Sequence, residues 1–349
     1  MAKEAGVSIT SASLVLNNRP MRVSKKKRAA ILDAAKQLNY VPNQTARSLA
    51  TNRSMLLALI VPDIQNLFFA SLAKSLEDSV SKHGYTLIIA NSDDSAVEEH
   101  NILQRLEARG IDGLFLVPSL ESVADSKGLH KDVSRLYFPV VLGDRLVDEQ
   151  WCDAVGSDNF MGGELAARFF IAQGHRKIAC ISGTNGSGNM NARKSGFVSG
   201  LEKAGLQLDP SLDCDGDYHF SSGYRQADHI IDQGATAVFC GNDLMALGFI
   251  KRLNERQLKC PQDCSVIGYD DVAGCLGLES ELTTIDQDIN SVALACSDCM
   301  MSRLEQLASD DHGEDKKARG KKKSQLWLKQ PRQYLVQPKL VENATVYTF

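Results

Sequence analysis

The sequence contains no apolar run that approaches the roughly 18 residues needed for a membrane-spanning helix. Its first residues also lack the basic-then-apolar pattern of an export signal. These absences argue against a membrane or exported protein, and we expect a soluble cytoplasmic one.

Aromatic residues are scarce, at 6% of a 349-residue chain, whereas 43% of the residues are hydrophobic. This composition differs from that of a disordered chain and suits an aliphatic core of mixed helices and strands. The length predicts two or three units rather than one small domain.

The nine cysteines lack the spacing of a metal site. Cys260 lies near Cys264, and Cys296 and Cys299 form a CxxC, but a zinc site needs two such pairs at finger-like distances. The odd, scattered set favours reduced thiols in the cytosol, and we expect no metal.

Catalytic and nucleotide-binding motifs are also missing. The segment GTNGSGN at 183–189 lacks the Lys-Ser/Thr of a P-loop, and no acidic residue follows at the distance of a dinucleotide site. No histidine is attached to a serine, cysteine or metal motif. We therefore expect no enzymatic activity and no cofactor.

Charge is distributed unevenly along the chain. Residues 1–54 carry ten Lys and Arg against Glu4 and Asp33, which gives this segment a charge of +8. Because the net charge of the chain is −4, the remaining residues carry a charge of −12. A basic block beside an acidic body is typical of a nucleic-acid-binding module.

Small capping residues mark helix boundaries in this basic block. The segment AKEAGVS is expected to end a first helix at Gly6, a usual left-handed C-cap. Ser8 then caps a helix over about 9–16, and Ser24 caps a third. This order predicts an all-α helix-turn-helix unit.

A short polar segment follows, in which Pro42 ends the preceding element and Asn43 caps about two helical turns. Leu49 is the one large apolar residue of this helix. It either rests against a neighbouring domain or acts as a wedge between base steps in the minor groove, and we favour the wedge.

From Met55 onward, apolar strands alternate with helical segments. The strand candidates are LLALIV, TLIIA, GLFLV and PVVL, then KIACIS, AVFC and SVIG. Such alternation predicts two doubly wound α/β lobes with parallel sheets and a ligand cleft at their carboxyl edges. Residues 309–324 are charged and of low complexity, which favours a surface insertion.

Several motifs, in this order and spacing, resemble those of the lactose-repressor/galactose-repressor (LacI/GalR) family of bacterial regulators. They are AGVSITSASLVLN, LNYVPNQTARSLA, DNFMGG, GHRKIACISG, NDLMALG, VIGYDD and LTTIDQD, and the resemblance covers nearly the whole chain. It implies a helix-turn-helix headpiece, a hinge helix ordered by DNA, and a core like periplasmic sugar-binding proteins. The family usually acts as a dimer on a near-palindromic operator.

The resemblance also implies domain boundaries. The headpiece would cover 1–41 and the hinge 42–54. The first core lobe would comprise 55–157 with 288–308, and the second 158–287 with 325–349, separated by the insertion at 309–324. Family members carry a few residues before AKEAGVS that form most of the first helix. We therefore expect either a misassigned start at Met1 or an incomplete headpiece.

DNA-contacting positions follow from the same resemblance. The start of the second helix would face the major groove, where Leu14 can contact only a thymine methyl or the groove wall, unless it is a headpiece core residue. Specificity would then rest on polar neighbours and on DNA bending at the wedge. The expected DNA-binding residues are Ile9, Thr10, Ser11, Ser13, Leu14, Asn17, Asn43, Ala46 and Leu49.

Matching positions also indicate an effector site. Carboxylates accept hydrogen bonds from sugar hydroxyls, arginine donates them, and amides do both. Aromatic rings cover the apolar face of a sugar. The expected residues are Phe68, Phe69, Asp144, Arg193, Tyr218, Asn242, Asp270 and Gln287. A monosaccharide or small sugar derivative is the first choice. A nucleobase is the alternative, weakened by Ser187 where nucleobase-binding members carry an arginine.

The sequence as a whole predicts a DNA-binding transcriptional regulator, usually a repressor in this family, that acts as a homodimer under the control of a small effector. The rival interpretation is a cytosolic sugar sensor that does not bind DNA. A sugar-modifying enzyme is a further rival, which no set of residues supports.

Overall fold

The computed structural model describes residues 2–16, 23–38, 40, 53–147, 149–183, 188–278, 280–310 and 330–348. The chain divides into two compact units, Met1–Ser54 and Met55–Phe349. Within the described residues, no helix is both long enough and apolar enough to cross a membrane.

The described part of the smaller unit forms two helices, α1 (Ile9–Leu16) and α2 (Lys25–Gln37). Ser8 and Ser24 cap them, because their hydroxyls accept the N–H groups of Ser11 (3.1 Å) and Lys27 (3.3 Å). Before α1, residues 2–6 form turns rather than a regular helix, with Gly6 at a positive φ of 63°. A small apolar cluster joins the two helices through Ala12, Val15 and Ile31.

The first lobe of the larger unit is built on a six-stranded parallel sheet in the order β11-β5-β4-β3-β1-β2. Its strands are β1 (Leu56–Val61), β2 (Thr86–Asn91), β3 (Gly113–Leu116), β4 (Val140–Gly143), β5 (Asp153–Ser157) and β11 (Gln333–Val336).

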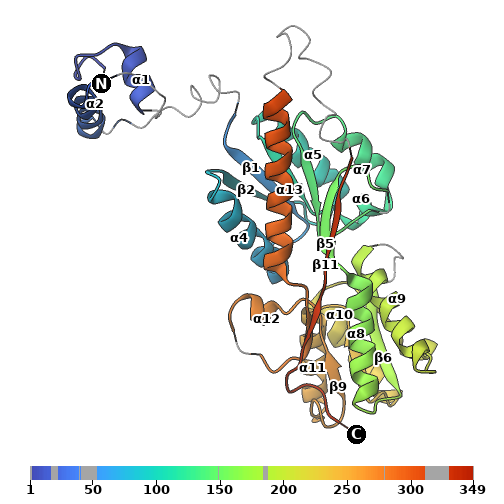
Figure 1. Ribbon diagram of the computed structural model, residues 1–349. Helices are drawn as coiled ribbons and strands as arrows, with labels where there is room; N and C mark the ends of the chain where they lie inside the picture. The colour runs from blue at the N-terminus through green and yellow to red at the C-terminus, as the bar shows by residue number, and fades with distance from the viewer. Residues whose placement is uncertain are drawn as a thin grey trace. The chain divides into compact units, whose positions relative to one another are not determined.

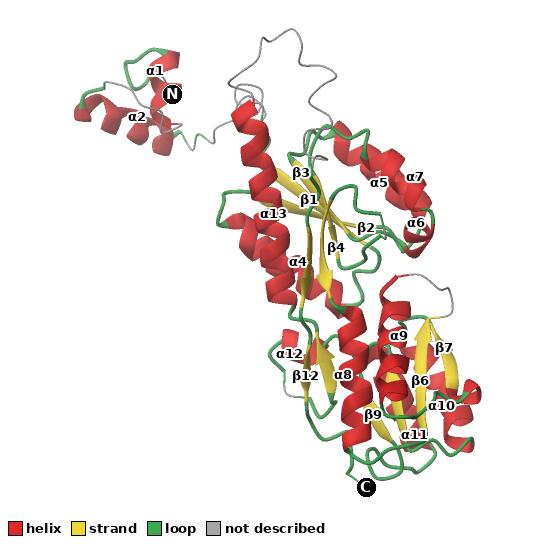
Figure 2. Ribbon diagram, turned by 45° about the vertical axis from the view of Figure 1, so that its right-hand side comes forward, coloured by secondary structure: helices red, strands yellow, loops and turns green. Residues whose placement is uncertain are grey.

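Helices cover both faces of this sheet. The helices α4 (Leu67–Ser81) and α13 (Ile289–Asp310) lie side by side on one face (Figure 1). The helices α5 (Ala96–Ala108), α6 (Leu120–Ala124) and α7 (Ser126–Val133) lie on the other side (Figure 2).

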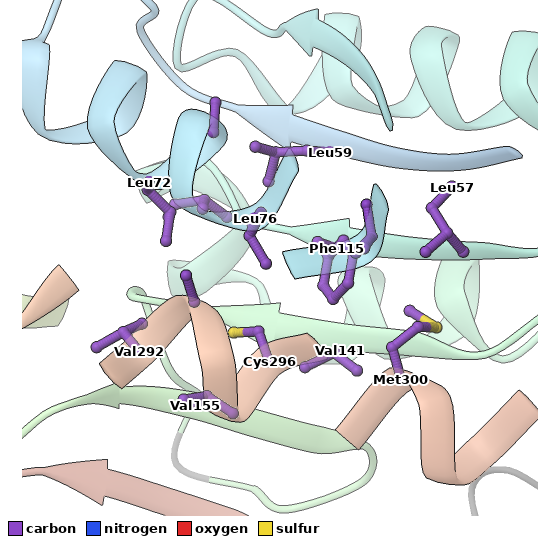
Figure 3. Close-up of a cluster of buried hydrophobic side chains, with 14 of the residues drawn as sticks. Leu57, Leu59, Leu72, Leu76, Phe115, Val141, Val155, Val292, Cys296 and Met300 are labelled. Atoms are coloured by element: carbon purple, nitrogen blue, oxygen red, sulfur yellow. The ribbon is translucent and has the colours of Figure 1, made fainter. Parts of the chain in front are cut away.

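Alternation along β1 divides its side chains between the two layers. Leu57 and Leu59 pack toward α4 and α13 with Phe115 and Met300 (Figure 3), whereas Ile60 packs in the opposite cluster. A strand buried on both faces has to be apolar throughout, which explains the uninterrupted run LLALIV.

The second lobe contains a four-stranded parallel sheet in the order β7-β6-β8-β9 and a two-stranded antiparallel sheet of β10 and β12. The strands are β6 (Ile178–Gly183), β7 (Asp213–Gly216), β8 (Ala237–Cys240), β9 (Ser265–Ile267), β10 (Thr284–Asp286) and β12 (Lys339–Val341). The helices are α8 (Asn159–Ala172), α9 (Gly188–Lys203), α10 (Phe220–Asp232), α11 (Asp243–Glu255) and α12 (Val272–Cys275), with a 3₁₀ turn at Pro210–Leu212.

Glycines allow α8 and α9 to approach closely. A Cβ at position 163 would lie 1.9 Å from the carbonyl oxygen of Arg193, and one at position 196 would lie 1.8 Å from that of Phe160. Only glycine fits at these two points, so the packing of α8 fixes the position of α9.

The chain passes between the lobes from β5 to α8, from β10 to α13 and from β11 to β12. The last crossing corrects one expected boundary. Residues 333–336 were assigned to the second lobe, but β11 pairs with β5 and belongs to the first. The chain therefore re-enters the second lobe only near β12. Most of the expected insertion at 309–324 lies outside the described residues, and Ser309 and Asp310 end α13.

Candidate functional site

A cavity of about 300 Å³ lies between the two lobes of the larger unit. It is lined by residues that follow parallel strands of both lobes, the usual place for ligands in open α/β sheets. Seven of the eight expected effector residues line it: Phe68, Phe69, Asp144, Arg193, Tyr218, Asp270 and Gln287. We call this space the cleft cavity.

Arg193 is the central cation of the cleft cavity, and it is only 2% exposed. Its Nε donates to Oδ1 of Asn159 (2.7 Å), and its Nη1 donates to the carbonyl oxygen of Gly241 (2.6 Å). The guanidinium also lies 3.7 Å from the ring centroid of Tyr269. Although burial opposes ionisation, Asp270 leads the neighbouring groups that raise the pKa of Arg193. The arginine is therefore charged and rigidly oriented.

Two buried carboxyl groups face this arginine. Burial raises the pKa of Asp270 to about 7, although the charge of Arg193 acts in the opposite direction. Burial likewise raises the pKa of Asp144, against the effects of Arg193 and Arg145 and a hydrogen bond with Asn189. Both aspartates have a positive φ, of 105° and 58° respectively. Such strained backbone concentrates at ligand-binding sites.

Gln287 supplies an unused hydrogen-bonding group. Its Nε2 donates to Oδ1 of Asp270 (2.7 Å), which fixes the amide. Its Oε1 is buried and has no hydrogen-bond partner among the described residues. A buried acceptor without a partner is costly, so a donor group on a ligand would be favourable here.

Aromatic rings supply the apolar part of the cleft cavity. Phe68 and Phe69 at the start of α4 meet edge to face, with centroids 5.2 Å apart and planes at 80°. Tyr218 comes from the other lobe, and burial raises the pKa of its hydroxyl. The surface combines ring faces with fixed polar groups, as small-molecule sites generally do.

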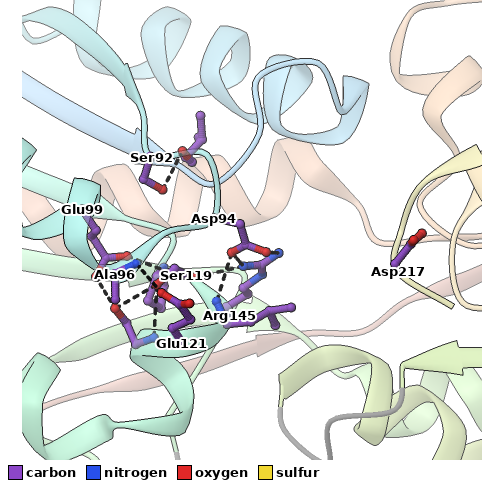
Figure 4. Close-up of polar contacts among 12 residues, drawn as sticks. Ser92, Asp94, Ala96, Glu99, Ser119, Glu121, Arg145 and Asp217 are labelled. Atoms are coloured by element: carbon purple, nitrogen blue, oxygen red, sulfur yellow. Dashed lines mark hydrogen bonds and ion pairs between the residues drawn. The ribbon is translucent and has the colours of Figure 1, made fainter. Parts of the chain in front are cut away.

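Arg145 belongs to the cavity, although the sequence analysis did not single it out. Its guanidinium carbon lies 5.9 Å from the ring centroid of Phe69 and 5.7 Å from that of Tyr218. Its Nη1 also donates to Oδ1 of Asp94 at 2.5 Å (Figure 4). Arg145 thus contacts an aromatic ring from each lobe. The sequence signal that could have identified Arg145 was its position beside Asp144, directly after an apolar strand.

Further lining residues were also missed, among them Asp94, Asn189 and Asp217. The Oδ1 atom of Asp94 accepts the N–H of Leu120 (3.0 Å). The buried Glu99 supports the segment around Leu120, because its carboxylate accepts the N–H of Ser119 (2.7 Å). Figure 4 shows Asp217 on the facing lobe, apart from this cluster.

Asn242 does not line the cleft cavity, contrary to expectation. It is fully buried and caps α11, because its Oδ1 accepts the N–H of Met245 (2.9 Å). Its Nδ2 donates to the carbonyl oxygen of Tyr218 (2.8 Å). With both ends of the amide occupied, Asn242 orients the Tyr218 loop.

The expected DNA-binding residues fall into two groups. Ile9, at 82% exposure, and Thr10 are exposed in the first turn of α1, whereas Ser11 and Leu14 are half-buried. Leu14 is not among the described residues of the headpiece cluster. The Ser13 side chain and all of Asn17, Asn43, Ala46 and Leu49 lie outside the described residues.

A small helical unit followed by a two-lobed α/β core with an interlobe cavity is typical of ligand-responsive DNA-binding proteins. Comparison with known sequences agrees with this class. The family "Bacterial regulatory proteins, lacI family" matches residues 1–43, and "Periplasmic binding protein-like domain" matches residues 167–320.

Two similar proteins are both named HTH-type transcriptional repressor PurR. The one from Edwardsiella ictaluri is 34% identical over 321 residues, which cover 89% of this chain and 91% of that protein. The one from Yersinia enterocolitica is 32% identical over 349 residues, which cover 99% and 95%. The chain therefore belongs to the LacI family and is a DNA-binding transcriptional repressor.

Solved structures share the fold. The lac repressor dimer bound to operator and the anti-inducer ONPF matches with a TM-score of 0.81 at 24% identity, over 99% of this chain and 97% of that one. The regulator CelR in complex with cellobiose matches with a TM-score of 0.66 at 26% identity, over 99% and 98%. A LacI-family regulator from Enterococcus faecalis V583 with bound ribose matches with a TM-score of 0.69 at 26% identity, over 84% and 99%.

Proposed function

We propose that a neutral sugar bound in the cleft cavity controls this repressor. The observation that carries the proposal is the buried array of Arg193, Asp270 and Gln287, in which one amide oxygen is left for a ligand donor. Sugar hydroxyls donate and accept in adjacent pairs, which suits carboxylate, guanidinium and amide groups held side by side.

The size of the cavity and the ligands of two solved regulators support the same ligand class. A volume of about 300 Å³ is at the small end of ligand pockets, which fits one sugar ring. Cellobiose and ribose are the ligands named for two solved regulators of similar fold. A nucleobase is the competing class, but Phe68 and Phe69 lie at 80° to each other and so do not form a parallel slot that would sandwich a planar base.

We also propose how the headpiece binds DNA. The exposed Ile9 and Thr10 would enter the major groove with Ser11, and Leu14 would contact a thymine methyl. Ser13 and Asn17 would complete this surface. Asn43 would cap the hinge helix, in which Ala46 and Leu49 would enter the minor groove. The protein would act as a homodimer on a near-palindromic operator.

Ligand and DNA would be coupled through the lobes. A sugar held by Phe69 from one lobe and Arg193 from the other favours one relative position of the lobes. That position would set the separation of the two hinge helices in the dimer. The coupling energy is then the difference in sugar affinity between the two states.

The effector proposal is tested by calorimetric titration of the whole protein with monosaccharides, disaccharides and nucleobases. At least one sugar should bind, and Gln287→Leu should weaken it about tenfold or more, because a buried polar contact is lost. Gln104→Leu, at an exposed position on α5, should leave the affinity unchanged. Binding of a nucleobase and of no sugar would overturn the proposal.

The DNA proposal is tested by selecting operators from random duplexes and measuring their affinity by fluorescence anisotropy. We expect a palindromic site, which Leu49→Ala binds about tenfold or more weakly because the wedge is removed. The sugar affinity of this variant should equal that of the original chain. Equal loss of both affinities would contradict the proposed division of labour.

A further inference from the structure

A second and larger cavity, of about 550 Å³, lies beside the crossing from β5 to α8. Both lobes contribute to it: Ala124 of α6 and Leu146 after β4 on one side, and Phe160 of α8 and Ala192 of α9 on the other. We call this space the side cavity.

The charge of the lining restricts what the side cavity can bind. Among the described residues that line it, Asp158 is the one ionisable group, and its carboxylate caps α8 by accepting the N–H of Met161 (2.9 Å). An anionic ligand would face this carboxylate without a cationic side chain from the described lining. The lining therefore disfavours an anionic ligand.

A buried hydroxyl points to a ligand that can form hydrogen bonds. Ser157 lines the side cavity and is 4% exposed, and its Oγ has no hydrogen-bond partner within the described part of the chain. The nearby carbonyl oxygen of Ser157 is already engaged, because it accepts from Nδ2 of Asn159 (3.1 Å). A free buried hydroxyl is costly, so a ligand hydroxyl that bonds to it would stabilise the bound state.

The remaining lining is divided between apolar and amide groups. Leu146 and Phe160 offer apolar surface, and Phe160 is 43% exposed. The lining also includes the amide side chains of Asn189 and Asn191. Sugar rings have this dual character, with an apolar face and a rim of hydroxyls.

The two cavities are neighbours. Asn189 lines both of them, and Asn159, which lines the side cavity, accepts the Nε–H of Arg193 in the wall of the cleft cavity. Asn189 therefore borders both cavities, and a ring in each of them would lie on either side of this residue.

We infer that the side cavity binds a second neutral sugar ring, so that the effector is a disaccharide whose first ring occupies the cleft cavity. This inference rests on the proposed sugar control. A separate monosaccharide would supply the same chemistry, and the stoichiometry of binding distinguishes the two sources. In either case the second ring contacts both lobes and adds to the preference for one relative position of them.

The test compares D-glucose and D-ribose with cellobiose, maltose and lactose, by calorimetric titration of the whole chain. Ala124→Trp fills the side cavity from an exposed position, whereas Ala108→Trp places the same ring on an exposed position elsewhere in the first lobe. We expect one disaccharide to bind about tenfold or more tightly than the monosaccharides. Ala124→Trp should remove this advantage and leave monosaccharide affinity unchanged. Ala108→Trp should leave the affinity for both kinds of sugar unchanged. Two monosaccharides per chain, reduced to one by Ala124→Trp, would identify separate rings in the two cavities.

Ser157→Ala provides a second variant that leaves the volume almost unchanged. It should weaken the disaccharide about three- to tenfold and leave monosaccharide affinity intact, because only the contact in the side cavity is lost. Equal weakening of both sugars, or no effect of either variant on the disaccharide, would overturn the inference. If the inference is overturned in this way but monosaccharides still bind, the proposed sugar control stands. If no sugar binds, the proposed sugar control and the inference both fail.

Discussion

Arg193 and Asp270 form an ion pair with 3.3 Å between Nη1 and Oδ1, although the two side chains come from α9 and from the loop after β9. They are 2% and 4% exposed, so each charge depends on the other for compensation. The pair thereby joins the helical layer of the second lobe to the strand ends that form the cleft cavity.

Replacing Arg193 with Met should lower the free energy of unfolding by about 3–5 kcal/mol, the typical result of removing one partner of a buried pair. Both Asp270 and Asp144 would be left without this cation. Urea unfolding followed by circular dichroism measures the loss. The double variant Arg193→Met/Asp270→Asn should recover part of it, and a single variant as stable as the original chain would disprove the dependence.

The pH dependence of stability should report two buried carboxyl groups. Burial raises the pKa of Asp270 to about 7 and that of Asp243 to about 8, from 3.8 for both in the reference state. Both groups therefore hold their protons more tightly in the folded protein than in the unfolded chain. Their contribution to stability is complete below about pH 4 and is lost as the pH rises through 7 and 8.

Asp243→Asn isolates this effect, because it cannot ionise. The variant should be less stable at pH 5, where it disturbs the hydrogen bonds that Asp243 accepts from Val272 (2.9 Å) and Thr284 (2.6 Å). The difference from the original chain should shrink toward pH 8.5, measured as urea midpoints across the range. Asp298→Asn, on the exposed side of α13, is the control. A difference that does not change with pH would contradict the assignment.

Much of the fold could be predicted where one local signal suffices. The run LLALIV coincides with β1, and the Ser8 and Ser24 caps stand where expected. The strand β5 was missed because DAVGS opens with an acidic residue. Asp153 is buried there only because Arg303 and Arg332 reach it from about 150 and 179 residues further along the chain. No local pattern predicts such a partner.

The candidate site shows the same division. Positions after strands could be read from the sequence, because parallel strands bring their carboxyl ends to one edge. The role of Arg145 could not be predicted from the sequence, since its orientation depends on Asp94, which lies 51 residues earlier. Asn242 stands at a strand end as expected, but its amide is used by Met245 and Tyr218. Sequence position thus predicts which residues reach the edge, and tertiary contacts decide which of them remain available to a ligand.

Asp153 should be a major source of stability in the first lobe. Its carboxylate accepts from Arg303 (2.7 and 2.8 Å) and from the backbone N–H of Arg332 (2.9 Å), and thereby links β5, α13 and the segment leading to β11. Burial opposes ionisation, but these two arginines lower the pKa of Asp153 below its usual value. Its contribution is thus present above about pH 4 and lost as the pH falls through the lowered pKa.

Asp153→Ala should therefore cost about 3–5 kcal/mol at pH 7, since it removes the carboxylate that compensates the charge of the buried Arg303. The cost should decrease in more acidic solution, where the original carboxylate is also neutralised. Urea titrations at pH 7 and pH 3 provide the comparison. Lys74→Ala, which removes an exposed ion pair on α4, should leave stability nearly unchanged. A cost equal for both variants would show that burial of the Asp153 network has no energetic effect.

Gly196→Ala should affect the fold and the site together. The added Cβ would lie 1.8 Å from the carbonyl oxygen of Phe160, a backbone atom that can move only with α8. The two helices must separate, which should cost about 1–3 kcal/mol or more in stability. Because Arg193 lies one helical turn earlier on α9, the same movement should displace its guanidinium from Asp270 and weaken effector binding. Ser195→Ala, at the neighbouring exposed position, controls for the change in helix composition. Lower stability with unchanged effector affinity would show that Arg193 is held by its own hydrogen bonds rather than by the close approach of α8 and α9.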